Sequence, residues 1–363
     1  MTNFGFFVLL LIPLLGHIYI FWHVWQLLPT PAWVKVLALL LMAAAFACLF
    51  FGMRGNNALS LSQNTIVYKI GTSWLIILLY MFLLFLVLDV LRLVHVFPAS
   101  LLHHSLKGTL LVAGILLTIL IYGNVNYHHK VRQPLELTTV KALGKPLKIV
   151  MMSDLHLGYG NRKADFHKWV DQINAEQPDL ILIAGDIIDS STKPLMEEKT
   201  YEEFHRLQAP VVACLGNHEY FGGQGGALEF YQKAGIRLLR DEVMEWGDLC
   251  IVGRDDRSNL HRKTLASLTE GIDHSKYLIL LDHQPYELEK TEDAHIDFQL
   301  SGHTHHGQVW PISWITEHVY ECAFGFYQRG DTRYYISSGL GIWGAHFRIG
   351  TRSEYVVATL HNE

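Results

Sequence analysis

The stretch Gly302-His303-Thr304-His305 decides the fold, because it completes a set of polar side chains spread over the second half of this 363-residue chain. It follows a short apolar run, and several other apolar runs also end in residues able to bind a metal. These are Asp154-Leu155-His156, Gly185-Asp186, Gly216-Asn217-His218-Glu219 and His283. Carboxylate, amide and imidazole groups are ligands for divalent cations. The set therefore predicts a two-metal centre at the ends of β-strands.

The segments between these residues alternate strand-like and helix-like patterns. Apolar runs at 148–153, 180–184 and 211–215 are typical of buried strands. A helical spacing of apolar residues at 162–177 and a second helical stretch at 195–208 separate these runs. This order indicates βαβ units.

Later strand-like runs follow with fewer helices between them, at 236–240, 249–253, 277–282, 296–301, 333–338 and 355–360. A half built of βαβ units followed by a β-rich half predicts an α/β domain. We expect two mixed β-sheets packed face to face with helices outside. We place this domain at residues 147–363.

The first 127 residues have the composition of a membrane domain. Each of four apolar stretches reaches the roughly 20 residues that a helix needs to cross a bilayer. Tryptophan and tyrosine gather near their ends, as interface anchors do. We predict a transmembrane bundle of four helices at residues 1–127, followed by a polar linker at 128–146. The helices are expected at about 4–28, 32–53, 70–97 and 106–124.

Four spans place both ends of the bundle on one side of the membrane, together with the loop between the second and third spans. Basic side chains near the membrane are slightly more numerous on that side, with Arg54, Lys69, Lys130 and Arg132 against Lys35, Lys107 and Arg92. Because basic residues favour the cytoplasmic side, we expect the C-terminal domain to face the cytoplasm.

The two parts of the chain carry opposite formal charge. Residues 1–127 hold five basic residues and one acidic residue, whereas the remainder holds 24 basic and 33 acidic residues. An acidic domain argues against a nucleic-acid partner, which is bound through its phosphates. Asp89, the acidic residue of the first part, lies three residues from Arg92. We expect Asp89 to pair with Arg92 or with a neighbouring helix.

The spacing inside the polar groups suits shared metal binding. Side chains two residues apart in an extended segment point to the same side, so Asp154 and His156 can reach one cation. His303 and His305 repeat this spacing. Asp186 follows a central strand and is the natural carboxylate to bridge two cations. One such pair is weak evidence for a metal site, but several pairs at the ends of successive strands are specific evidence for one.

The complete set resembles the calcineurin-like metallophosphoesterase superfamily, and in particular its membrane-anchored bacterial branch. The resemblance to the superfamily covers about 147–361 and rests on Asp154-x-His156, Gly185-Asp186-x-x-Asp189, Gly216-Asn217-His218-Glu219, His283 and Gly302-His303-x-His305. The likeness to the bacterial branch rests on residues 302–308 and on Ser337-Ser338-Gly339-Leu340-Gly341. One departure is visible. The branch usually has glycine where this chain has His306, and the extra imidazole could add a hydrogen bond or crowd the pocket.

The resemblance implies two divalent metal ions and a role for each residue. The first metal would be bound by Asp154, His156 and His305. The second would be bound by Asn217, His283 and His303. Asp186 would bridge the two metals, and His218 would be the catalytic residue that faces the substrate phosphate. Mn²⁺ suits this mixed oxygen and nitrogen ligand set, with Fe or Zn²⁺ as alternatives. The branch also implies a multi-pass protein of a bacterial inner membrane.

Other residues near the motifs leave alternatives open. Asp189 fits a residue that orients a ligand or caps a helix better than a metal ligand. Arg254 could grip a second phosphate or form a surface ion pair. His128-His129 fits a solvated pair beside the membrane better than a metal site. The stretch Trp310-Pro311-Ile312-Ser313-Trp314 could form an apolar lip for a lipid or part of an ordinary core.

Two cations that hold a hydroxide and clamp phosphate oxygens predict hydrolysis of a phosphoester or pyrophosphate bond. His218 could stabilise charge or protonate the leaving group. The membrane bundle favours a phosphorylated lipid or nucleotide-linked lipid as substrate, since lipid headgroups are concentrated at a bilayer. The alternatives are a phosphodiesterase for a soluble nucleotide-type substrate or other small phosphoester, and a catalytically silent membrane metal-binding sensor or scaffold.

Overall fold

The computed structural model describes residues 3–55 and 58–363, with side chains from residue 14 onward except that of Arg54. The chain divides into two compact units, Met1–Val125 and Asn126–Glu363. Each unit is described by itself.

The first unit is helical. It contains α1 (Asn3–Leu27), α2 (Ala32–Arg54), α3 (Leu61–Leu93), the short 3-10 helix η1 (Ala99–Leu102) and most of α4 (Leu106–His128). Among the described residues, three helices are long and apolar enough to cross a membrane by length and composition: Ala32–Met53, Leu61–Leu93 and Leu106–His128. The side chains of α1 up to residue 13 lie outside the described part, so the first of the four predicted spans stays a prediction.

Helix α3 begins earlier than the apolar pattern indicates. Its first turn is polar and is capped by Ser60, whose hydroxyl accepts a hydrogen bond from the Gln63 amide at 3.3 Å. Near its other end, Asp89 pairs with α1 rather than with Arg92. The Asp89 carboxylate lies 3.0 Å from His23 Nε2 and accepts a 2.7 Å hydrogen bond from the Tyr19 hydroxyl. Of the two pairings expected from the sequence, the one observed is therefore the pairing with a neighbouring helix.

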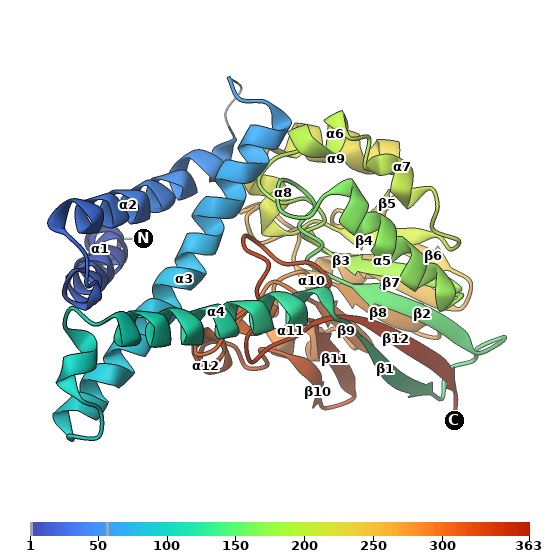
Figure 1. Cartoon of the computed structure of the whole chain (residues 1–363). Helices are drawn as coiled ribbons and strands as arrows, with labels where there is room; N and C mark the ends of the chain where they lie inside the picture. The colour runs from blue at the N-terminus through green and yellow to red at the C-terminus, as the bar shows by residue number, and fades with distance from the viewer. Residues whose placement is uncertain (1–2, 56–57) are drawn as a thin grey trace. The chain divides into compact units, whose positions relative to one another are not determined.

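The second unit contains two mixed six-stranded sheets (Figure 1). The first sheet has the order β1-β12-β2-β3-β4-β5, in which only β12 and β2 run antiparallel. Its strands are β1 (Lys130–Thr139), β2 (Leu147–Met152), β3 (Leu180–Ala184), β4 (Val211–Cys214), β5 (Arg237–Leu238) and β12 (Ser353–Asn362). These bounds confirm the βαβ interpretation of this half.

The second sheet has the order β10-β11-β9-β8-β7-β6, with antiparallel pairs only at its two edges. Its strands are β6 (Glu242–Trp246), β7 (Leu249–Gly253), β8 (Tyr277–Leu281), β9 (Phe298–Ser301), β10 (Gly325–Arg329) and β11 (Thr332–Ile336). The expected fold class, two mixed sheets with helices outside, is confirmed.

Alternating side chains build the layers of this unit. In β3, Leu180 and Leu182 face the second sheet and pack with Ile251 and Ile279, whereas Ile181 and Ile183 face the outer helices. Those strands are buried on both sides, which explains their continuous apolar sequences. The outer helices are α5 (Lys163–Ala175), α6 (Lys193–Glu197), α7 (Tyr201–Phe204), α8 (Asn217–Phe221), α9 (Gln224–Ala234), α10 (Leu265–Thr269), α11 (Leu288–Asp293) and α12 (Ile312–Val319).

Two local predictions need correction. The expected linker at 128–146 contains β1, which begins two residues after α4 and pairs in parallel with β12 over its whole length. The single helix expected at 195–208 is two short helices, α6 and α7, because the chain turns between them and Lys199 has a positive φ of 52°.

Candidate metal centre

The structure brings the predicted site residues together at the carboxyl ends of neighbouring strands. In the first sheet, Asp154 and His156 follow β2, Asp186 follows β3 and Asn217 follows β4. In the second sheet, His283 follows β8, while His303 and His305 follow β9. Because each of these strand sets is parallel, their carboxyl ends share one edge. Crevices at such edges are the usual ligand sites of α/β folds.

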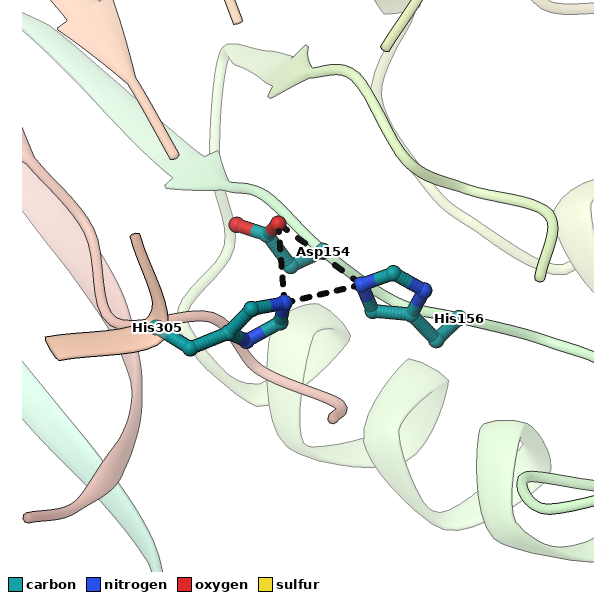
Figure 2. A group of neighbouring side chains, drawn as sticks. All are labelled: Asp154, His156 and His305. Carbon is teal, nitrogen blue, oxygen red and sulfur yellow. Dashed lines mark hydrogen bonds and ion pairs between the residues drawn. The ribbon is translucent and has the colours of Figure 1, made fainter. Parts of the chain in front are cut away.

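Asp154, His156 and His305 form the first group of converging side chains (Figure 2). The Asp154 Oδ1 atom lies 3.7 Å from His156 Nε2 and 3.4 Å from His305 Nε2. The two ring nitrogens are 3.0 Å apart. One carboxylate oxygen and two imidazole nitrogens directed at a common point could hold a divalent cation.

Asp186, His283 and His303 form a second group. The Asp186 Oδ2 atom lies 3.1 Å from His283 Nε2. The side-chain oxygen of Asn217 lies 3.1 Å from His283 Nε2 and 2.7 Å from His303 Nδ1, so it belongs to the same cluster. His283 Nδ1 donates to the Ala184 carbonyl at 2.8 Å, which directs the lone pair of Nε2 into the group.

Asp186 connects the two groups. The same Oδ2 atom that approaches His283 lies 3.6 Å from His156 Nε2 in the first group. The other oxygen, Oδ1, accepts a 2.9 Å hydrogen bond from the His218 amide, which fixes the carboxylate. A carboxylate held between two sets of ligands has the arrangement of a bridging ligand.

Two glycines allow the backbone to approach the carboxylates. A Cβ atom at Gly216 would lie 2.1 Å from Asp186 Oδ1, and a Cβ atom at Gly302 would lie 2.2 Å from Asp154 Oδ2. Neither position has room for a side chain. The glycines of the two motifs therefore serve the packing of the site, not the flexibility of the loops.

Several predicted ligands have unusual backbone conformations. Asp154, His156, Asp186, His303 and His305 all have positive φ, between 44° and 71°. Such values are uncommon for residues other than glycine and are found mostly where the surrounding structure enforces them. Hydrogen bonds of Asp154 N to Gly185 O and of His156 N to Asp186 O provide that constraint. The concentration of these conformations supports a functional site.

The electrostatics of the centre favour a positive charge. Burial opposes protonation of His156, but its hydrogen bonds to Asp154 and Asp189 raise its pKa to about 10. Burial lowers the pKa of His303 to about 4 and that of His305 to about 3, so both rings are neutral near pH 7. His303 and His305 are therefore ready donors, whereas the nearby carboxylates raise the pKa of His156 and of His283, and a divalent cation would take the place of the protons on those two rings. The residues present therefore fit a pair of such ions.

His218 lies beside the two groups and is oriented by Asp189. The His218 Nδ1 atom is 3.1 Å from Asp189 Oδ1, and its ring stands at 82° to that of His156 with centroids 4.5 Å apart. With Nδ1 held by a carboxylate, Nε2 is the nitrogen that could contact a phosphate. Asp189 is buried and touches His156 as well, at 3.7 Å, as expected for a residue that orients its neighbours.

Glu219, which the sequence marks only as part of a motif, fixes three backbone amides. Its carboxylate accepts from Gly216 N at 2.7 Å, Asp186 N at 3.2 Å and Ile188 N at 2.9 Å. Burial, together with the negative charge of Asp186, raises the pKa of Glu219 to about 7. The side chain thereby joins the loops after β3 and β4.

Two further residues, which the sequence does not single out, hold the ligand loops in place. Arg348, fully buried, donates to the carbonyls of His305 at 2.6 Å and Gly341 at 3.3 Å. Asn161 donates to the carbonyls of Leu155 and His156 at 3.0 and 3.1 Å. Both are single polar residues without a motif around them, and only their burial reveals their role.

Other residues singled out in the sequence lie elsewhere. Arg254 forms an ion pair with Asp282 at 3.1 Å, but the pair is buried rather than at the surface. His128 and His129 are exposed and take no part in either ligand group. The stretch from Trp310 to Trp314 is not ordinary core, because 40% and 62% of these two tryptophans are exposed.

The departure at His306 has a structural counterpart. The His306 Nε2 atom lies 2.8 Å from Glu317 Oε1 of α12, and the ring stacks on Phe324 with centroids 4.6 Å apart. The imidazole therefore adds a hydrogen bond, the first of the two effects considered above. It points to α12 and not into either ligand group.

Comparison with known proteins agrees with this site. The calcineurin-like phosphoesterase family model matches residues 147–307, which include every predicted ligand. A metallophosphoesterase of Campylobacter jejuni is 33% identical over 257 residues, covering 68% of each chain. The chain belongs to the calcineurin-like metallophosphoesterase family, whose members depend on a dinuclear metal centre.

Two further similarities differ in what they cover. A Danio rerio protein described as a transmembrane protein with a metallophosphoesterase domain is 28% identical, over 69% of this chain and 62% of that one. A solved structure, the 5′-nucleotidase precursor of Thermus thermophilus, is 18% identical over 44% of this chain and 42% of that one, with a TM-score of 0.33. A likeness at that level says nothing about the substrate.

Proposed function

We propose that this protein is a membrane-anchored, two-metal phosphoesterase that hydrolyses a phosphoester or pyrophosphate bond of a phosphorylated lipid or nucleotide-linked lipid. The observation that carries the proposal is the position of Asp186 between two groups of ligands. The first group would hold one metal through Asp154, His156 and His305. The second would hold the other through Asn217, His283 and His303. Mn²⁺ is the ion that we expect.

The bound metals would supply a hydroxide nucleophile and neutralise charge on the phosphate. The chain itself positions the other parts. Asp186 and the amide of His218 fix the bridging position, and Asp189 holds the His218 ring by Nδ1. Through Nε2, His218 would contact a phosphate oxygen or pass a proton to the leaving group. Burial of these groups keeps their charges strong.

The three apolar helices support the membrane part of the proposal, and the lipid substrate follows from it as an expectation. A lipid headgroup stays at the bilayer, where a membrane-anchored site meets it at high local concentration. The cytoplasmic orientation and the bacterial inner membrane belong to the same proposal. They are supported by the distribution of basic residues and by bacterial relatives.

The test uses purified full-length protein, stripped of metal and then supplied with Mn²⁺, acting on bis-p-nitrophenyl phosphate. We expect metal-dependent turnover that Asp186→Ala lowers by about 10²–10³-fold. The matched control is Asp331→Ala, in an exposed turn, which should keep full activity. Two bound metals without turnover on this or a monoester probe would favour a silent sensor or scaffold.

The lipid part is tested separately, with phosphorylated lipids held in vesicles. Turnover of such lipids that exceeds turnover of soluble nucleotides supports the proposal. Turnover confined to soluble nucleotide diesters would instead establish the alternative phosphodiesterase function.

A further inference from the structure

Helix α12 and the tryptophan before it carry an apolar surface. The exposed fractions of Trp310, Trp314, Ile315 and Val319 are 40%, 62%, 58% and 59%. A shallow groove along the helix is lined by Pro311, Trp314, Ile315, His318 and Val319, of which His318 alone is polar. Large apolar side chains gathered on one face of a helix mark a binding surface, not a surface that faces water.

This helix is attached to the metal centre at both of its ends. At its start, a Cβ atom at Gly307 would lie 2.4 Å from the Ser313 amide, so the loop of His305 packs directly on α12. Glu317 pairs with His306 at 2.8 Å. Just past its end, the Tyr320 ring lies 6.3 Å from that of His303, between centroids. A ligand on α12 would therefore lie beside both ligand groups.

The same helix is also close to the point where the chain enters the domain. Asn126, in the last turn of α4, donates to the carbonyls of Arg348 at 2.9 Å and Thr351 at 2.8 Å. The segment 348–351 in turn contacts the residues that precede α12, because the Trp310 amide donates a hydrogen bond to the Ile349 carbonyl at 2.7 Å. Both contacts lie within the second unit, Asn126–Glu363.

The length of α4 places this entry point at a membrane surface, if α4 spans the bilayer as proposed above. A helix of 23 residues extends about 34 Å at 1.5 Å per residue, close to the roughly 30 Å of a bilayer core. Its last turn, which contains Asn126, would then leave the hydrocarbon. Little chain remains to separate the domain from the lipid, since β1 begins at Lys130.

We propose that α12 docks in the interfacial layer of the lipid bilayer, with Trp310, Trp314, Ile315 and Val319 in contact with lipid. The inference rests on the proposed membrane anchoring and extends it, because it names the surface by which the metal centre would meet lipid headgroups. Tryptophan favours this layer, and a short helix with one apolar face can lie in its plane. The contacts through His306 and Tyr320 would then align the ligand groups with the headgroup region.

The test places a fluorescent label on the full-length protein in phosphatidylcholine vesicles that contain nitroxide-labelled lipids. Cys48 and Cys322, which are partly accessible, are replaced by serine, whereas Cys214 and Cys250 are buried. Labels are attached through Ile315→Cys and, in a second variant, Val319→Cys. The matched control is Leu260→Cys, in an exposed loop with 91% of the side chain exposed.

We expect the nitroxide lipids to quench the labels on α12 about threefold more than the label at position 260. Equal quenching at all three positions would overturn the proposal, and a second copy or a protein partner would then be the occupant of the surface. The measurement needs no turnover. A failure of the proposed hydrolysis would therefore be seen in the activity assay and not here.

Discussion

At the scale of single residues, His218 is the residue that we propose for catalysis. Its Nδ1 lies 3.1 Å from Asp189, which leaves Nε2 for the proposed contact with the substrate. Asp189 itself is buried and shared with His156. We propose that His218 transfers a proton or stabilises charge, and that the other histidines of the motifs bind the ions.

We predict that His218→Ala lowers the rate of phosphodiester hydrolysis by about 10²–10⁴-fold, the usual contribution of a positioned acid or base. Metal content, measured by mass spectrometry of the purified protein, should be unchanged. His205→Ala, at an exposed position in the same domain, is the control. Full activity in the His218 variant would contradict the assigned role.

The motif residues could be predicted from the sequence because each of them follows an apolar strand and belongs to a spaced pattern. The residues that hold the ligand loops in place could not be predicted in this way. Arg348 and Asn161 bind backbone carbonyls of ligand loops that are far away in the sequence. Nothing in their immediate neighbours distinguishes them from surface residues, since their burial depends on the assembled fold.

At the scale of elements, the ligand loops depend on buried polar anchors. Arg348 joins the loop of His305 to the segment at Ser338 and Gly341 through three carbonyl oxygens. Burial lowers its pKa to about 10, and the negative charge of Asp154 opposes that shift. The guanidinium donates to these three carbonyls and, through Nε, to the Ser353 hydroxyl at 3.3 Å.

Replacing Arg348 by methionine should lower the free energy of unfolding by about 2–4 kcal/mol, because the carbonyls lose their donors while remaining buried. The affinity for the first metal should fall about tenfold, since the backbone of His305 is no longer held. Arg329→Met is the control, as that side chain is partly exposed and pairs with Glu292 and Glu321. Chemical denaturation and metal titration would measure both effects, and equal losses in the two variants would refute the role of Arg348.

The sequence patterns did not predict elements whose structure depends on contacts with residues far away in the chain. The sequence of β1 predicts a linker because its alternating polar residues, Lys130 to Thr139, resemble an exposed connection. Its partner β12 begins at Ser353, and only that pairing makes it a strand. Helix α12 is not among the elements expected from the sequence either, since Ile312–Val319 is only eight residues long and directly follows Pro311. Long apolar strands such as β2 and β3 were predicted correctly because they are buried on both sides.

At the scale of the whole molecule, the ions and the fold are expected to stabilise each other. Three buried aspartates, Asp154, Asp186 and Asp189, converge within one small region. Bound cations would offset their mutual repulsion. All three aspartates follow strands of the first sheet, whereas His283, His303 and His305 follow strands of the second sheet, so metal binding should tie the two sheets together.

We therefore predict that Mn²⁺ raises the midpoint of thermal unfolding of the domain by about 5–10 °C over that of chelator-treated protein. This corresponds to binding at about 100-fold above the dissociation constant. Differential scanning fluorimetry of the full-length protein in detergent measures the shift. The Asp186→Asn variant should show a much smaller one. Identical midpoints with and without Mn²⁺ would argue against a metal centre that spans both sheets.

Anomalous diffraction from crystals grown with Mn²⁺ would show whether Asp186 joins the two ligand groups into one dinuclear centre. We expect two peaks about 3.5–4 Å apart, with the Asp186 carboxylate between them. One peak would lie at Asp154, His156 and His305, and the other at Asn217, His283 and His303. A single peak, or peaks away from Asp186, would contradict a dinuclear centre bridged by Asp186.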